Sequence, residues 1–307
     1  MARFDAAVVL AMMESAYATD PVPTAAANAM LFQQVDWSLS GDLVDRPMVV
    51  PYMGNDPFSV VARGCMLSGE LDLASSGTLG TAPAWGPLLR ACGMAQTITA
   101  STRVDYTPIS SAQESNTFYH YLDGTLHRGT GARGDFSIEL VARQLPKLRV
   151  SLTALYNAPS AVGLPTPTLT AFQTPLAVEP VVTGTVSIGG NALPFSSFKY
   201  THGNRLVRQE IPGRSRVLIE QRAPSLEITV EAPDAVSPNL FSMIGAVQNI
   251  TLQHGQTAAS IIDIITRGRV QPEPKYSRGP EGQVYLTLQI RPEPTSAGND
   301  EFTLRVR

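Results

Sequence analysis

The chain has 307 residues, a formal net charge of −3 and a pI of about 5.8. This balance excludes a generally basic surface of the kind that binds nucleic acid tightly through counterion release. Charged residues make up only 16% of the chain, while Gly and Pro number 24 each. Such a composition is typical of many short strands joined by turns, and the length allows two ordinary domains.

Two features of the N-terminal half indicate the cellular compartment in which the protein folds. The two cysteines, Cys65 and Cys92, are too few for a disulfide framework in a chain of this size, so we expect free thiols in a reducing cytoplasm. The apolar run at residues 6–13 is followed by Ala-Tyr-Ala, which imitates a signal cleavage site. Asp5 lies where a positive region should be, and the run is far shorter than the ~20 residues that cross a bilayer. We therefore expect neither secretion nor a membrane span.

In the first half, a polar loop containing residues 53–57 leads to an alternating strand at 67–73. A short helix should follow, because four residues fall on one helical face and Gly93 provides a stop: Trp85, Leu88, Leu89 and Cys92. Asp123-Gly124 is a strong type I′ turn signal and predicts a hairpin at 118–127. Alternating strands at 136–142 and 148–156 complete this series.

The second half repeats that order of elements with different residues. A loop at 211–215 leads to a strand at 226–231, and Ser237 and Pro238 are the expected start of a short helix that ends at Gly245. His254-Gly255 is the expected hairpin turn. Closing strands are predicted at 261–265, 284–290 and 302–306.

Between the halves, residues 157–182 carry five prolines, which favour an extended linker. We place the domain boundary near residue 175. The sequence thus predicts an all-β fold of two consecutive β-sandwich or barrel domains, each with one flanking short helix. The expected divisions are an N-terminal arm at 1–30, a first domain with the linker at 31–175, and a second domain at 176–307.

Motifs that look chemical have structural explanations. The glycines at 129, 131 and 134 have dinucleotide-loop spacing, but an alternating strand follows them where a helix is required, so we expect a turn or bulge. His120 and His127 should face each other across the hairpin as solvated side chains, because no nearby residues complete a zinc site. No nucleophile motif is present either. We expect no catalytic residue, no cofactor and no metal.

Four segments together resemble a known family: ESAYATDP at 14–21, RP and PYMGN within 46–55, TAPAWGPLLRACG at 81–93, and SAGNDE at 296–301. In order and spacing they are similar to the major tail tube proteins of long-tailed siphophages. The resemblance implies a structural subunit of a non-contractile tail tube. It also implies tail tube domains whose inner sheets join into a barrel around a lumen.

Most such subunits carry one domain and form six-membered rings, so two domains in one chain imply a three-membered ring with pseudo-sixfold geometry. The implied partners are other copies of the chain, the tape-measure, terminator and distal tail proteins, and double-stranded DNA in passage. The location is the virion tail, after synthesis in the host cytoplasm. The alternatives are a secreted or cell-surface binding protein with two β-sandwich modules, and a β-rich enzyme.

Two surfaces are candidates for function. Long polar excursions at 42–62 and 204–216 are candidate inter-ring loops, with five residues singled out: Arg46, Tyr52, Asn55, Asp56 and Arg214. The second surface is the non-core face of two corresponding strands, with four acidic residues: Glu70, Asp72, Glu227 and Glu231. These could line a lumen and repel phosphates, or meet bulk solvent outside, because alternation fixes which residues share a face but not where it points.

Overall fold

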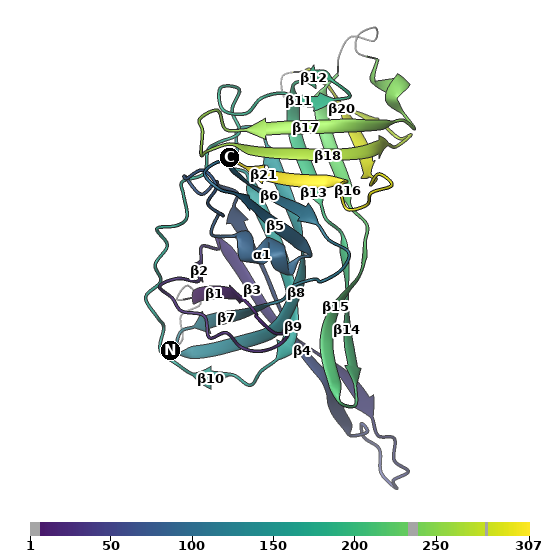
Figure 1. Cartoon of the computed structure of the whole chain (residues 1–307). Coiled ribbons are helices and arrows are strands. Elements are labelled where there is room, and N and C mark those ends of the chain that lie inside the picture. The colour runs from purple at the N-terminus through teal and green to yellow at the C-terminus, as the bar shows by residue number, and fades with distance from the viewer. Residues whose placement is uncertain (1–6, 233–238, 280–281) are drawn as a thin grey trace.

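The computed structural model describes residues 7–232, 239–279 and 282–307. Strands account for more than half of the chain. In the part described, helix is confined to α1 (Gly86–Ala91) and the 3-10 helix η1 (Leu240–Met243) (Figure 1). The fold is therefore all-β, which confirms the expectation from composition and alternation.

The strands of the first half are β1 (Ala7–Met13), β2 (Ala29–Met30), β3 (Gln34–Asp45), β4 (Phe58–Asp72), β5 (Met94–Thr99), β6 (Arg103–Pro108), β7 (Asn116–Leu122), β8 (Thr125–Val141), β9 (Lys147–Tyr156) and β10 (Ser160–Ala161). Those of the second half are β11 (Val186–Ile188), β12 (Asn191–Leu193), β13 (Phe195–Thr201), β14 (Asn204–Ile211), β15 (Arg214–Arg222), β16 (Ser225–Glu231), β17 (Val247–His254), β18 (Ile262–Val270), β19 (Lys275–Arg278), β20 (Val284–Pro292) and β21 (Phe302–Val306).

Eight strands form one continuous antiparallel sheet in the order β3-β4-β9-β8-β13-β16-β20-β19. The first four belong to the first half of the chain and the last four to the second. The halves meet where β8 pairs with β13, which sets Glu139 opposite Lys199 and Ile138 opposite Tyr200. Figure 1 shows most of the second half, in green and yellow, above the first half in purple and teal, while its green hairpin β14–β15 extends down beside the first half.

The two halves of this sheet have the same topology. In each half the first and second strands are connected through a hairpin, a short helix follows the second strand, and the last strand in sequence lies between the second and third. An equivalent backbone hydrogen bond follows the second strand in each half. Leu73 N donates to Pro146 O over 2.9 Å at the end of the β4–β9 pairing, and Ala232 N donates to Val284 O over 2.8 Å at the end of the β16–β20 pairing. The order of elements is thus repeated within one chain.

A second layer covers one face of the sheet. It contains the series β12-β11-β17-β18-β21-β6-β5, in which β21 of the second half pairs with β6 of the first. The core lies between the layers, and its fully buried members include Trp85, Tyr106, Tyr200 and Phe302. Trp85 also donates its indole N–H to Ala74 O over 2.8 Å, so its one polar atom is satisfied. Burial of large apolar side chains, about 1.5–3 kcal/mol each, holds the layers together.

Several predicted elements are confirmed in detail. The hairpin turns on Asp123-Gly124 with His120 opposite His127. Of the predicted helical face, α1 contains Leu88 and Leu89, while Trp85 and Cys92 are its N-cap and C-cap residues. Other details are wrong. A loop at 255–261 separates β17 from β18, so His254-Gly255 is no two-residue turn. The 3-10 helix η1 is capped by the Asn239 side chain, which accepts from Phe241 N over 3.1 Å. The predicted cap at Ser237 and the proline at 238 lie outside the described residues.

Candidate functional site

One face of the eight-stranded sheet is polar, and it carries all four acidic residues predicted from alternation: Glu70, Asp72, Glu227 and Glu231. Their sequence neighbours on the opposite face, Leu71, Leu226 and Val230, are fully buried in the core. The four carboxylates come from two strands, β4 and β16, that lie on either side of the seam between the halves. The structure therefore brings them to one surface, which we call the polar face.

The polar face differs from the acidic surface that the sequence indicated, because basic residues alternate with the acids. Along one row of cross-strand neighbours, Asp72 is followed by Lys147, Glu139, Lys199, Glu227 and Gln289. Lys147 Nζ lies 2.9 Å from Asp72 Oδ1, and Arg149 Nε lies 2.7 Å from Glu70 Oε2. The hydrogen bond from Arg149 lowers the pKa of Glu70 and so favours the charged pair.

Sequence reasoning missed these bases although the signal was available. Lys147 and Arg149 alternate with three buried residues of β9: Leu148, Val150 and Leu152. The same period-two pattern that placed Glu70 and Asp72 on one face places both bases on one face of the next strand.

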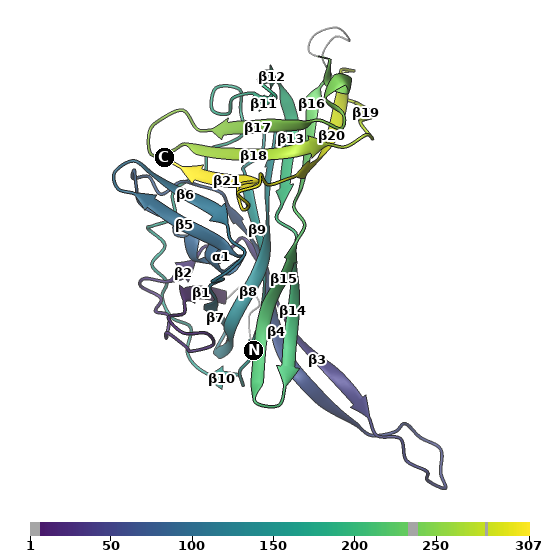
Figure 2. The ribbon, with the colours of Figure 1, turned by 45° about the vertical axis from the view of Figure 1, so that its right-hand side comes forward.

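The first candidate inter-ring loop, at residues 42–62, is a long hairpin arm made by the distal parts of β3 and β4. Its pairing continues to Asp45 opposite Phe58, so describing the whole excursion as a loop was wrong. A register shift between Ser40 and Asp42 accompanies the departure of the arm from the body of the sheet. Figures 1 and 2 show it projecting well beyond the rest of the chain.

The tip of this arm carries four of the predicted residues, Arg46, Tyr52, Asn55 and Asp56, and all are exposed. Arg46 N donates to Pro57 O over 2.9 Å, which closes the base of the tip. Apolar side chains are also exposed there, among them Met48, Val49 and Met53, and Phe58 and Val60 further along the arm. An apolar surface on a projecting arm is typical of a protein contact rather than of a catalytic loop.

The other predicted excursion, at 204–216, is likewise a hairpin. Strands β14 and β15 pair from Asn204–Arg222 to Ile211–Arg214, with Pro212-Gly213 between them, and Arg214 lies at that turn. A long loop was the wrong interpretation, because the alternation was obscured by the charged residues on the exposed side. Figure 2 shows this hairpin running beside β8, and β15 also contacts β9.

Side-chain contacts hold this hairpin against the first half of the chain, and we call these contacts the clamp. Arg133 donates to Val217 O over 2.8 Å, and Val217 N donates to the Tyr17 hydroxyl over 2.6 Å. Arg208 donates to the Ser40 hydroxyl over 2.8 Å. The Arg133 guanidinium also lies 5.1 Å from the centre of the Tyr17 ring, a cation–π contact. The β14–β15 hairpin is thus fixed to its own chain, whereas the β3–β4 arm projects freely.

The glycine motif at 129–134 shapes the clamp. It lies inside β8, where the register shifts between Thr130 and Arg133, so it forms the expected bulge and opens no helix. Gly131 has a φ of 62°, and a Cβ there would lie 2.8 Å from the Tyr17 ring. Its N–H donates to the Glu14 carboxylate over 2.7 Å. This arrangement contradicts dinucleotide binding, which needs a helix after the glycines.

The histidine pair was predicted as solvated, and for His120 this is wrong. His120 is only 6% exposed, and burial lowers its pKa to about 4. The His127 ring lies 6.1 Å from it between centroids, and the Trp37 ring is tilted against that of His127 with 4.0 Å between centroids. His120 lies on β7, which pairs with β1 on one side and with β8 on the other.

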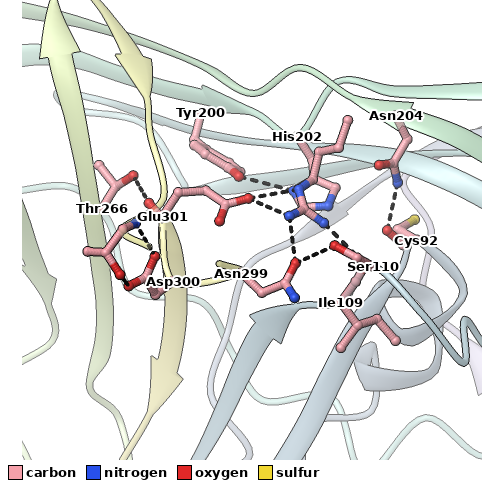
Figure 3. A network of polar contacts seen from close by, with 12 residues as sticks. Cys92, Ile109, Ser110, Tyr200, His202, Asn204, Thr266, Asn299, Asp300 and Glu301 are labelled. Carbon is pink, nitrogen blue, oxygen red and sulfur yellow. Dashed lines mark hydrogen bonds and ion pairs between the residues drawn. The ribbon is translucent and has the colours of Figure 1, made fainter. Parts of the chain in front are cut away.

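A partly buried polar network around Arg222 and Glu301 joins the halves (Figure 3). Arg222 at the end of β15 lies 2.6 Å from the Glu301 carboxylate and donates to Ile109 O over 3.2 Å. Asn299 accepts from Arg222 over 3.1 Å and from the Ser110 hydroxyl over 2.6 Å. The SAGNDE segment therefore connects the second half to the first, a role that no local pattern in the sequence could indicate.

Comparison with known proteins identifies the family. The family model described as phage tail tube protein matches residues 4–305. The chain belongs to the phage tail tube protein family. Membership implies a structural component of the virion tail that self-assembles into the tube, and it confirms the resemblance found in the sequence. No curated protein matches the chain. Within the described residues, no helix is long and apolar enough to cross a membrane.

Proposed function

We propose that this tail tube protein polymerises into stacked rings of a long non-contractile tail and that DNA passes through them. The observation that carries the proposal is the eight-stranded sheet. Among the described residues, β3 at one end pairs only with β4, and β19 at the other end pairs only with β20. An open sheet edge is a liability in a monomer but a joining surface in a ring that closes on itself.

The repeated topology supports a ring of three copies. Each copy supplies eight strands, so three copies would give a barrel of 24 strands, in which residues 31–175 and 176–307 each contribute one sixth. Residues 7–30, which include β1 and β2, would lie outside it. Native mass spectrometry or symmetry analysis of tube images tests this stoichiometry. A ring with six copies would mean that only one half of each chain lines the tube.

The polar face would line the lumen in such a barrel, because the opposite face is covered by the second layer. DNA must slide past this surface without binding. Lys147 and Arg149 both lie in ion pairs with carboxylates, which limits the release of phosphate counterions that drives nucleic-acid binding. Acid–base alternation can therefore serve a lumen as well as the wholly acidic lining that the sequence indicated.

Charge reversal tests the lumen assignment. Replacing Glu70, Asp72, Glu227 and Glu231 by Lys should leave the fold intact, since all four lie outside the core, and should slow or block DNA delivery by the particle. Delivery at the normal rate from intact tubes would exclude these residues as a lumen lining. Charge reversal of Glu220, an exposed carboxylate on β15, provides the control on another surface.

The β3–β4 arm would reach the adjacent ring, and Arg214 on the second hairpin would lie at the same end. Deleting residues 46–57 should leave soluble protein that forms rings but no longer stacks them, as judged by electron microscopy. Normal tubes from this variant would refute the stacking role. At the two ends of the tube, and inside it before ejection, the partners would be the terminator, distal tail and tape-measure proteins.

The alternative, a secreted two-module binding protein, predicts discrete particles in the same images. The family match favours the tube, and we assign the chain a structural rather than a catalytic role.

A further inference from the structure

The seam, where β13 pairs with β8, shows which side chains cover the joint between the two halves of the sheet. Strand β13 presents Phe198 and Tyr200 to the core, and both are fully buried. They lie opposite Leu140 and Ile138 of β8. Tyr200 stacks on Phe302 at 3.9 Å between ring centroids. Each aromatic side chain of β13 thus lies opposite an apolar side chain of β8.

The repeated topology identifies the residues equivalent to this seam at the two outer edges of the sheet. The shared hydrogen bonds of Leu73 and Ala232 align β4 with β16. Trp37 then corresponds to Tyr200, because each lies opposite an equivalent leucine, Leu67 or Leu226.

The other edge follows in the same way. Tyr276 of β19 lies opposite Leu286 of β20, as Ile138 of β8 lies opposite Leu148 of β9. Because β9 and β20 are aligned by the same pair of hydrogen bonds, Tyr276 corresponds to Ile138. The seam pair Tyr200–Ile138 therefore has the counterpart Trp37–Tyr276 at the outer edges.

At the β3 edge, Trp37 borders a cleft of about 1110 Å³. Residues from both faces of β3 line it, Val35 and Trp37 on one side and Gln34 and Asp36 on the other, and the cleft extends over the polar face as far as Thr201. Three buried nitrogens in its lining have no hydrogen-bond partner among the residues that the structure describes: Trp37 Nε1, His120 Nδ1 and His127 Nδ1. The cleft thus offers an apolar wall with unsatisfied polar atoms.

At the β19 edge, the matching feature is an exposed aromatic side chain. Tyr276 is 62% exposed, although it points to the same side of the sheet as the buried Leu286. Phe241 of η1, which is 47% exposed, lies 6.1 Å from it between ring centroids. A large aromatic residue left uncovered on an edge strand is typical of an interface anchor.

We propose that β19 of one copy pairs antiparallel with β3 of the next copy and sets Tyr276 opposite Trp37 over this cleft. The inference rests on the proposed ring and specifies its joint. The register places Ser277 opposite Asp36 and Lys275 opposite Ser38, so the Lys275 ammonium lies diagonally across from the Asp36 carboxylate. The phenol hydroxyl can donate to an imidazole nitrogen or accept from the indole N–H, both of which lack partners within one copy.

Engineered disulfides test the register. Asp36→Cys and Ser277→Cys in one chain place two thiols directly opposite each other on the polar face, close enough for a bond. The native cysteines are fully buried and should not compete. Mild oxidation of assembled rings should give covalent trimers on a denaturing gel. The control, Asp36→Cys with Arg278→Cys, leaves Tyr276 in place, sets the thiols on opposite faces of the sheet and should give monomers.

Truncation of the aromatic tests the anchor. Tyr276→Ala should fold normally by circular dichroism but raise the protein concentration needed for ring assembly by about tenfold or more, while Tyr276→Phe should have a smaller effect. Val181→Ala, at a side chain 84% exposed elsewhere, should assemble as the original protein does.

The outcomes separate the two proposals. Rings that form without the 36–277 crosslink, or that tolerate Tyr276→Ala, would overturn the joint and leave the tube function standing. A protein that forms no ring under any condition would overturn both.

Discussion

Removing Arg222 should destabilise the protein far more than removing any exposed arginine. Its guanidinium lies 2.8 and 2.6 Å from one oxygen of Glu301 and also donates to Ile109 O and Asn299. The Glu301 side chain is only 3% exposed and that of Arg222 only 16%. Arg222→Ala would therefore leave a carboxylate buried without its cation.

Breaking a buried pair in this way costs about 3–5 kcal/mol of unfolding free energy, and we expect the lower end because water can enter where Arg222 was. Urea unfolding of the unassembled chain, followed by tryptophan fluorescence, measures the loss. Arg269→Ala is the matched control, because its pair with Glu293 is exposed and should contribute little. Replacing Arg222 and Glu301 together by Met and Leu should recover part of the loss. Equal losses for Arg222→Ala and Arg269→Ala would refute the reasoning.

Three further predictions concern the core. Burial raises the pKa of Cys65 to about 12 and that of Cys92 well above its usual value, so iodoacetamide should label neither thiol until the protein is unfolded; labelling of the native chain would contradict this. Burial lowers the pKa of His202 to about 3, so between about pH 6.5 and 3 this side chain is protonated in the unfolded chain but neutral in the folded one. The free energy of unfolding should therefore fall as the pH drops through this range. His202→Phe should flatten this fall between pH 6.5 and 5 in urea titrations, and an unchanged slope would exclude His202 as its source. Gly134→Ala would place a Cβ 2.4 Å from Ser151 O and should lower the unfolding free energy by about 1–3 kcal/mol, whereas Gly54→Ala, with nothing within 4 Å, should be neutral in the same assay.

Local patterns predicted the parts of the fold that are set locally. The Asp123-Gly124 turn fixed the register of its hairpin, because a two-residue type I′ turn allows only one pairing. The spacing of apolar residues around Leu88 and Leu89 predicted α1, and both side chains are fully buried in the structure. Alternation placed Glu70 and Glu227 on the non-core face of their strands.

Long-range partners were beyond such patterns. The clamp between Arg133 and Val217 joins residues 84 positions apart, and the pair of Arg222 and Glu301 spans 79. Only the folded chain decides which carbonyl or carboxylate such an arginine meets.

The two hairpins β3–β4 and β14–β15 were predicted as loops for a different reason. Their exposed strands carry polar and apolar residues on both faces, so no core-facing alternation marks them.

The inequality of the two hairpins has a consequence for how the tube is built. One hairpin is bound to its own chain at Tyr17 and Arg133, and the other projects as a long arm. In the three-membered ring proposed above, long arms would alternate with short hairpins around the rim. Successive rings could then engage in orientations 120° apart but not 60° apart. Image averaging with sixfold symmetry would superimpose the two hairpins and blur both, whereas threefold averaging would resolve a rim with three prongs.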